Sequence, residues 1–129
     1  MPSDLKVSRM SLWMKISGVS GAAAVTLGAI GAHAFLKKKP EFSEIFKTAS
    51  QYHFIHALAM LAISAADSTG LISKNKIDIV NKLFLLGKIL FCGSLYLIAF
   101  REDKTFINKI APFGGISLIC GWLAIAFYP

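Results

Sequence analysis

Two of the three histidines in the sequence lie close together, in the segment TASQYHFIHALAML at residues 48–61. His53 and His56 are three residues apart, so they share one face of a helix, and Tyr52 lies beside that face. Imidazole side chains can relay protons, bind a metal ion or contact a quinone or a haem. Because the surrounding residues are apolar, we expect these side chains to face the interior of a helix bundle.

The third histidine, His33, ends the first long apolar segment, on the side from which the second segment starts. All three histidines could therefore converge in one half of the molecule. The simpler interpretation is that they hydrogen-bond neighbouring carbonyls or the polar groups of Thr48, Ser50 or Gln51, and so hold the first two helices together. The predicted polar cluster consists of His33, Tyr52, His53 and His56.

The apolar segments contain no Asp or Glu, and this composition argues against several kinds of chemistry. Ion-coupled transporters generally place acids in the membrane, and a serine hydrolase needs an acid to orient its histidine. A metal ion would find only neutral imidazoles and two distant thiols, Cys92 and Cys120, which we expect to be packing residues. A haem would need His33 as its second ligand. We therefore predict no enzyme activity, no cofactor and no metal site.

Four long apolar segments position these side chains, at about residues 12–35, 46–66, 80–100 and 110–128. Each can cross a hydrocarbon core of roughly 30 Å at a helical rise of about 1.5 Å per residue. The chain has 129 residues, of which 55% are hydrophobic and only 16% charged. An open sheet would leave unpaired backbone groups in lipid. We predict one domain over residues 1–129, an all-α, integral membrane antiparallel four-helix bundle.

The helix ends carry weaker signals. Ser43 is a candidate N-cap of the second helix, and Pro112 fits the first turn of the fourth. The first apolar segment is longer than the apolar core of a secretory signal, so we expect it to be retained.

Small residues on the first and last segments predict close helix packing, because they let two backbones approach in lipid. One of these stripes could instead form the seam of a homodimer. The predicted packing glycines are Gly21, Gly28, Gly31, Gly114, Gly115 and Gly121.

The formal net charge of +7 comes from basic residues that gather at the ends of the segments, as at residues 37–39. There they can reach lipid headgroups or an acidic partner, so we predict phospholipid contacts and no nucleic acid. The two sides of the membrane carry similar numbers of Lys and Arg, so the orientation stays open.

Lys88 is the one charged residue that we expect to be buried, because it lies well inside the third apolar segment. With no acid in these segments, it would snorkel to a headgroup, meet water or find an acidic group on another molecule. We predict that Lys88 contacts a lipid or a partner subunit.

Four blocks of sequence carry a family resemblance: GAIGAH at 28–33, the histidine segment at 48–61, LFCGSLYLI at 90–98 and APFGGISLICGWLAIAF at 111–127. Their order and spacing resemble the small four-span membrane family of unknown function that includes bacterial YgdD and animal transmembrane protein 256. The resemblance covers the chain from about Ser17 onward. It brings no reaction, substrate or cofactor. The signature positions are Gly28, Gly31, His33, His53, His56, Ser94, Tyr96, Gly114, Gly115, Gly121 and Trp122.

The stretches HFIH and LFC within these blocks resemble the animal branch of the family more than the bacterial one. This resemblance implies a location in the mitochondrial inner membrane, or in the bacterial inner membrane if the source is prokaryotic. We predict a non-enzymatic accessory or assembly subunit of a larger inner-membrane complex, with the respiratory chain as its setting and other membrane subunits as partners. One alternative is a small carrier or channel lined by His33, His53 and His56. Another is a histidine-based cofactor binder.

Overall fold

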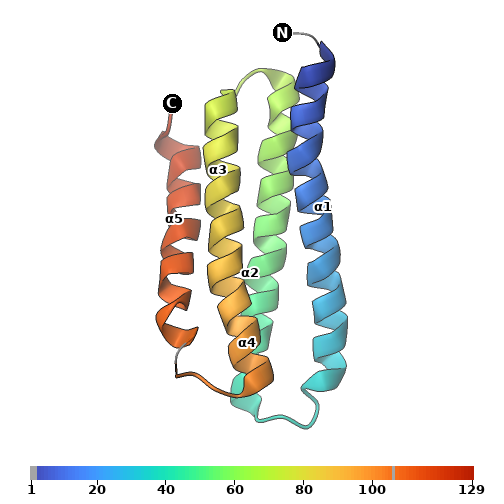
Figure 1. Ribbon diagram of the computed structural model, residues 1–129, viewed down its shortest axis with the longest axis vertical. Helices are drawn as coiled ribbons and strands as arrows, with labels where there is room; N and C mark the ends of the chain where they lie inside the picture. Colours follow the sequence, from blue (N-terminus) through green and yellow to red (C-terminus); the bar gives the residue numbers. More distant parts are fainter. Residues whose placement is uncertain (1–2, 106) are drawn as a thin grey trace.

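The computed structural model describes residues 3–105 and 107–129, and the regular secondary structure of this part of the chain is entirely helical (Figure 1). Three segments, α3, η2 and α4, follow one another without a break as a helix of 28 residues, Lys74–Arg101, which we call the third rod. The elements are α1 Ser3–Ala34, α2 Pro40–Ala65, η1 Ala66–Thr69, α3 Lys74–Gly87, η2 Lys88–Cys92, α4 Gly93–Arg101, η3 Ile107–Lys109 and α5 Ala111–Phe127.

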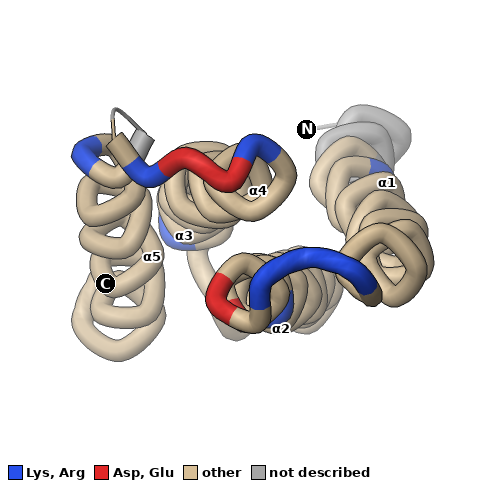
Figure 2. The backbone as a smooth tube through the Cα atoms, turned by 90° about the horizontal axis from the view of Figure 1, so that it is seen from below, with Lys and Arg blue, Asp and Glu red and all other residues tan. Residues whose placement is uncertain are grey.

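The four long helices run side by side and alternate in direction, so that both ends of the chain lie at the same end of the molecule (Figure 1). Seen end-on, α2 and the third rod form the centre, with α1 on one side and α5 on the other (Figure 2). The most extensive contacts join α1 to α2 and α3 to α5. The bundle is thus two helical hairpins packed together, and the predicted all-α fold is confirmed for the described residues.

Each predicted segment corresponds to one long helix. The first three helices begin earlier than predicted, whereas Pro112 lies in the first turn of α5 as predicted. The second helix begins at Pro40, which occupies its first turn with Glu41, and the N-cap residue is Lys39, without a side-chain cap. The prediction of Ser43 as the N-cap is therefore wrong. The third rod begins at Lys74 because Ser73 Oγ accepts a hydrogen bond from the Lys76 backbone at 3.2 Å. Caps and a first-turn proline set these ends, and both lie outside the apolar segments.

A π-helical turn, η2, interrupts the third rod at Lys88–Cys92. Such turns insert an extra residue into an α-helix and are frequent at functional sites. No proline lies in this segment, so the sequence gives no signal for it.

The apolar core has two parts, one towards each end of the bundle. One contains Met60, Ile63, Ile77, Val80, Phe84 and Leu118. The other contains Phe35, Phe42, Phe46, Ile98 and Ala99. Lys88 and Ser94 are among the buried polar residues that lie between these two parts along the third rod.

The predicted packing glycines fall into three groups. A methyl group at Gly31, Gly114 or Gly121 would overlap an atom of a neighbouring helix, whereas at Gly28 and Gly115 the nearest atoms would lie 3.8 and 3.7 Å away, at ordinary contact distance. At Gly21 no atom would lie within 4 Å, so Gly21 does not pack as predicted. The sequence analysis missed Gly87, where a methyl group would lie 2.5 Å from Leu118 and 3.0 Å from the Gly114 carbonyl oxygen.

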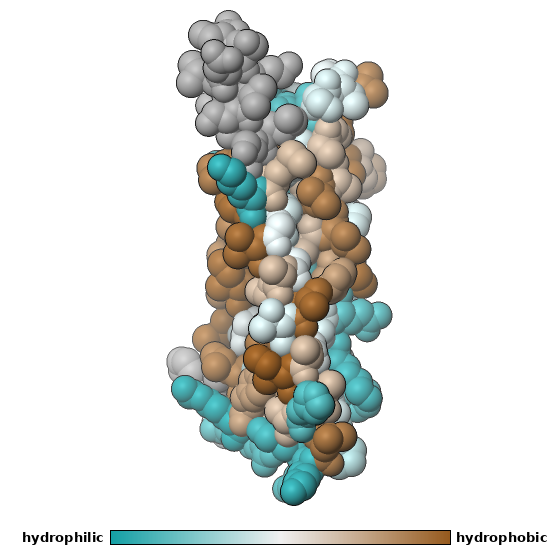
Figure 3. All heavy atoms as spheres, turned by 90° about the vertical axis from the view of Figure 1, so that its right-hand side faces the viewer, coloured by the Kyte–Doolittle hydropathy of each residue, from teal (hydrophilic) through white to brown (hydrophobic). Residues whose placement is uncertain are grey.

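Two of the described helices are long and apolar enough to cross a membrane, Leu12–Ala34 and the third rod, while α5 is a shorter apolar helix. The histidine-containing helix α2 does not meet this test, because polar residues occupy much of its first half. On the face formed mainly by α1, hydrophobic atoms occupy the middle and hydrophilic atoms gather at the lower end (Figure 3).

Candidate functional site

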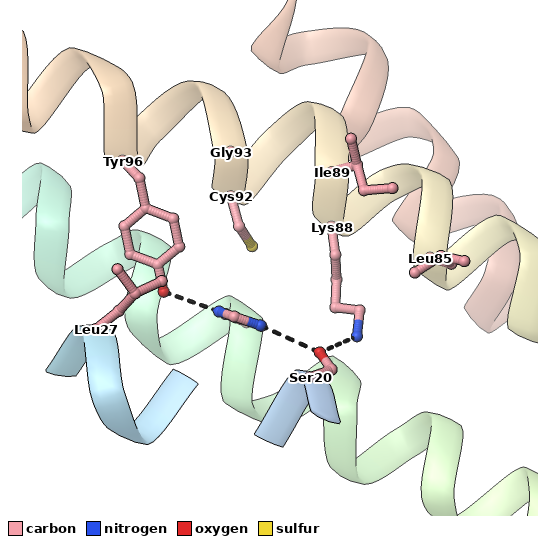
Figure 4. Close-up of a pocket in the computed structure, with 9 residues that line it drawn as sticks. Ser20, Leu27, Leu85, Lys88, Ile89, Cys92, Gly93 and Tyr96 are labelled. Carbon is pink, nitrogen blue, oxygen red and sulfur yellow. Dashed lines mark hydrogen bonds between the residues drawn. The ribbon is translucent and has the colours of Figure 1, made fainter. Parts of the chain in front are cut away.

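Four polar side chains form a continuous hydrogen-bonded row between α1, α2 and the third rod (Figure 4). Lys88 Nζ donates to Ser20 Oγ at 2.5 Å. Ser20 Oγ lies 3.1 Å from His53 Nε2, and His53 Nδ1 lies 3.0 Å from the Tyr96 hydroxyl. We call Ser20, His53, Lys88 and Tyr96 the polar row.

The donors and acceptors of the polar row fit together in two ways. A charged lysine only donates, so Ser20 accepts from Lys88 and can donate its own proton to His53 Nε2. His53 then carries its proton on Nδ1 and donates to Tyr96. In the other histidine tautomer, Tyr96 donates to Nδ1 and Nε2–H donates to Ser20. Both arrangements use every group, so the row does not fix the tautomer of His53.

Lys88 is the first residue of the π-helical turn, and only 5% of its surface is exposed. It lies near the middle of the third rod, roughly 20 Å along the axis from either end at about 1.5 Å per residue. A lysine side chain is too short to reach a membrane surface from that depth. Snorkelling, one of the three possibilities for Lys88, does not occur, because the side chain turns inward and bonds to Ser20. The predicted contact of Lys88 with a lipid or a partner subunit stays a prediction.

A cavity of about 230 Å³ lies beside the polar row (Figure 4). The row forms one side of this cavity, and the remaining lining is mainly apolar. It consists of Leu27, Leu85, Ile89, Cys92 and Gly93.

No ion pair among the described side chains includes Lys88. Ion pairs of the described side chains lie towards the ends of the helices, where charged residues gather in the connecting segments (Figure 2). They include Lys38–Glu102, Lys47–Glu44 and Lys104–Glu41.

His56 takes part in a separate contact, on the side of α2 that faces α5. Its Nδ1 donates to the Tyr52 carbonyl at 2.7 Å, and Trp122 Nε1 donates to its Nε2 at 3.0 Å. The ring must therefore be neutral, with its proton on Nδ1 and no free nitrogen for a metal. At 3% exposure, His56 is a buried link between α2 and α5.

We expect Trp122→Phe to lower the free energy of unfolding by about 1 kcal/mol, because it removes the donor to His56 Nε2 and keeps an aromatic ring in place. Chemical unfolding in detergent, followed by circular dichroism, measures the change. In a His56→Phe background the same substitution should cost little. Equal losses in the two backgrounds would contradict a role for this hydrogen bond.

The predicted histidine cluster forms only in part. His33 is exposed near the end of α1, thirteen residues beyond Ser20 and so roughly 20 Å along that helix from the polar row. Tyr52 contributes its carbonyl to His56 and stacks on that ring with centroids 6.0 Å apart. His53 and His56 face different partner helices, and a polar lining made by all three histidines does not occur.

Three residues of these contacts were missing from the predicted cluster. Tyr96 and Trp122 belong to the blocks that carry the family resemblance, so their positions could have suggested them. Ser20 lies in a stretch of small residues that gives no such signal. The buried pair of Asn81 and Ser64, joined by a 3.1 Å hydrogen bond, also went unnoticed.

Among the described residues, no three His, Cys, Asp or Glu side chains gather in a way that could hold a metal ion. Cys92 is buried beside the cavity, whereas Cys120 is exposed on α5.

The fold and the site define a class of small helical protein in which long apolar helices enclose a hydrogen-bonded polar row. Residues 27–115 match the model of a family described as "Protein of unknown function (DUF423)". The chain belongs to this family, and the predicted membership of a small membrane family of unknown function is confirmed. The match includes three residues of the polar row, with Ser20 outside it.

Similar proteins are described as UPF0382 membrane proteins. One from Staphylococcus saprophyticus is 32% identical over 90% of this chain and 94% of its own length. YwdK of Bacillus subtilis is 30% identical over 90% of this chain and 94% of its own length. One from Haemophilus influenzae is 31% identical over 89% of this chain and 90% of its own length. No solved structure matches this chain. The protein is thus a membrane protein, and its mitochondrial location stays a prediction, because these relatives come from bacteria.

Proposed function

We propose that this membrane protein spans an inner membrane four times and acts, without catalysing a reaction, as an accessory or assembly subunit of a larger complex. The respiratory chain is the proposed setting, in the mitochondrial inner membrane or, for a prokaryotic source, the bacterial one. The observation that carries the proposal is the surface of α1. This helix makes its extensive contacts with α2 alone, and its opposite face is exposed.

The exposed face of α1 has the composition of a helix-packing surface. It combines small residues, which let another backbone approach, with the large apolar side chain of Val19, which is 71% exposed. The polar row lies on the other side of the helix and takes no part in this face. The face includes Gly18, Val19, Ala22, Val25 and Ala29.

Four crossings are consistent with the helix lengths. The shortest, α5, has 17 residues, or roughly 25 Å at about 1.5 Å per residue, close to the thickness of a hydrocarbon core. In α2, His56 faces the interior and has both nitrogens hydrogen-bonded, which supports its placement in lipid. The basic residues 37–39, in the turn between α1 and α2, are placed to meet phospholipid headgroups.

Extraction of the tagged protein from native membranes in mild detergent tests the accessory role. We expect a native-gel mass well above that of the monomer, with other membrane subunits in the same band. A photo-crosslinking residue at Ala22 should capture one of these subunits, whereas one at Leu86, exposed on the third rod, should capture it less.

Migration as a free monomer, with crosslinks from Ala22 to lipid only, would overturn the accessory role. Crosslinks between two copies of the chain would also overturn it, and would assign the α1 face to a homodimer instead.

A further inference from the structure

When it is protonated, Lys88 carries a charge that no described side chain of the protein balances. Its one hydrogen bond goes to Ser20, a neutral hydroxyl, although an ammonium group has three protons to donate. A buried charge normally pairs with an opposite charge, because transfer from water to an apolar interior is costly. The described side chains therefore supply no anionic group to pair with a charged Lys88.

The depth of Lys88 limits where this anion can come from. In the proposed four-span arrangement, on which this inference rests, the residue lies near the centre of the membrane, about 15 Å from either surface of the hydrocarbon core. The acids of the connecting segments pair at the helix ends, as Glu102 and Glu41 do. Phospholipid phosphates lie at the surface. An anion that comes from neither of these sources can reach Lys88 if it is dissolved in the lipid.

The cavity beside Lys88 has the shape and lining for such a molecule. Its volume of about 230 Å³ has room for a carboxyl group and several methylene groups, since one water takes about 30 Å³. The cavity lies between α1 and the third rod, two elements without extensive mutual contacts. Ile89, which is 61% exposed, links its lining to the outer surface. Apolar walls at Leu27 and Leu85 suit a hydrocarbon chain.

We propose that this cavity binds the carboxyl end of a long-chain carboxylic acid dissolved in the membrane, with Lys88 as its counter-ion. The acid enters in its neutral form, the O–H bond breaks, and the proton forms an N–H bond on a neutral Lys88 amine. The resulting carboxylate and ammonium ion form a pair of zero net charge, so no uncompensated charge crosses the lipid. The hydrocarbon chain passes Leu27 and Ile89 into the bilayer.

Equilibrium binding of radiolabelled palmitic acid to the full chain in phosphatidylcholine nanodiscs tests this site. We expect saturable binding of one molecule per chain. Lys88→Met should weaken palmitate binding roughly tenfold or more, because it removes one charge-assisted hydrogen bond. Lys82→Met removes an exposed charge from the same rod and should leave binding unchanged.

A second variant tests the cavity with Lys88 in place. A methyl group at Gly93 would meet no atom within 4 Å, and its backbone is helical, so Gly93→Leu can place its side chain in the cavity without strain. We expect Gly93→Leu to abolish palmitate binding while its circular dichroism spectrum and unfolding curve stay close to those of the unsubstituted protein. Unchanged binding by either Gly93→Leu or Lys88→Met would overturn the proposal.

Competitors separate the sources of the anion. Unlabelled palmitic acid should displace the label, whereas acetate and hexadecanol should not. Displacement by acetate would indicate a free-anion site, displacement by hexadecanol a site for the hydrocarbon chain, and displacement by phosphatidic acid a headgroup site; each would overturn the proposal. Absence of saturable binding would also overturn it. The accessory role is judged separately, by the native mass and the crosslinks.

Discussion

Replacement of Gly114 by alanine is expected to lower the free energy of unfolding by about 1–3 kcal/mol, the usual cost of overpacking a protein interior. Movement of side chains relieves little of this cost. A methyl group at Gly114 would overlap the Phe91 backbone nitrogen and lie 2.7 Å from the Leu90 carbonyl carbon. Backbone atoms of the third rod cannot rotate away as a flexible side chain would. The two helices must therefore separate.

The neighbouring glycine supplies the control. At Gly115 a methyl group would lie 3.7 Å from the Phe91 ring, at ordinary contact distance, so Gly115→Ala should change the free energy of unfolding by less than about 0.5 kcal/mol. Both variants can be unfolded in the same detergent and followed by circular dichroism. Similar unfolding curves for the two variants would contradict the close approach of α5 and the third rod at Gly114.

Ser20→Ala is expected to lower the free energy of unfolding by about 1.5–3 kcal/mol, the range for hydrogen bonds to charged groups. The substitution removes the acceptor for Lys88 Nζ and also the partner of His53 Nε2. Both groups are then left in the interior without the partner that α1 supplies. The cost depends on the buried charge, so it should fall below about 1 kcal/mol when Lys88 is replaced by methionine.

A double-mutant cycle with Ser20→Ala and Lys88→Met, unfolded in detergent, measures this coupling. Thr26→Ala is the matched control, because Thr26 lies on the same helix and bonds only to the Ala22 carbonyl, at an exposed position. We expect it to have a small effect in both backgrounds. Additive losses for Ser20→Ala and Lys88→Met would show that the two side chains do not interact in the folded protein.

The helices could be predicted from the sequence because long apolar segments in lipid can only be helical. Their starts could not, since Pro40 and Ser73 set them outside those segments. Glycine spacing predicts a stripe but not the neighbour it meets. Gly21 and Gly31 are ten residues apart, which places them roughly 80° apart around the helix. Gly21 therefore faces open space, whereas Gly31 faces the Phe46 ring.

The polar site was harder to predict than the fold. The sequence singled out His53, His56 and Lys88 as costly groups in an apolar setting, but not where their hydrogen bonds go. Those partners come from other helices, Ser20 from α1 and Trp122 from α5. Their positions depend on helix rotation and on the π-helical turn, which no local sequence pattern specifies. Hydrogen bonds between residues close in sequence could be predicted, whereas those between residues distant in sequence could not.

The division of the bundle into two hairpins has a consequence for biosynthesis. The α1–α2 hairpin precedes the third rod in the chain, so in the proposed four-span arrangement Ser20 and His53 enter the membrane before Lys88. The residue that is most expensive to insert thus meets a hydrogen-bonding partner that is already in place. The order of the helices along the chain lowers the cost of inserting the later hairpin.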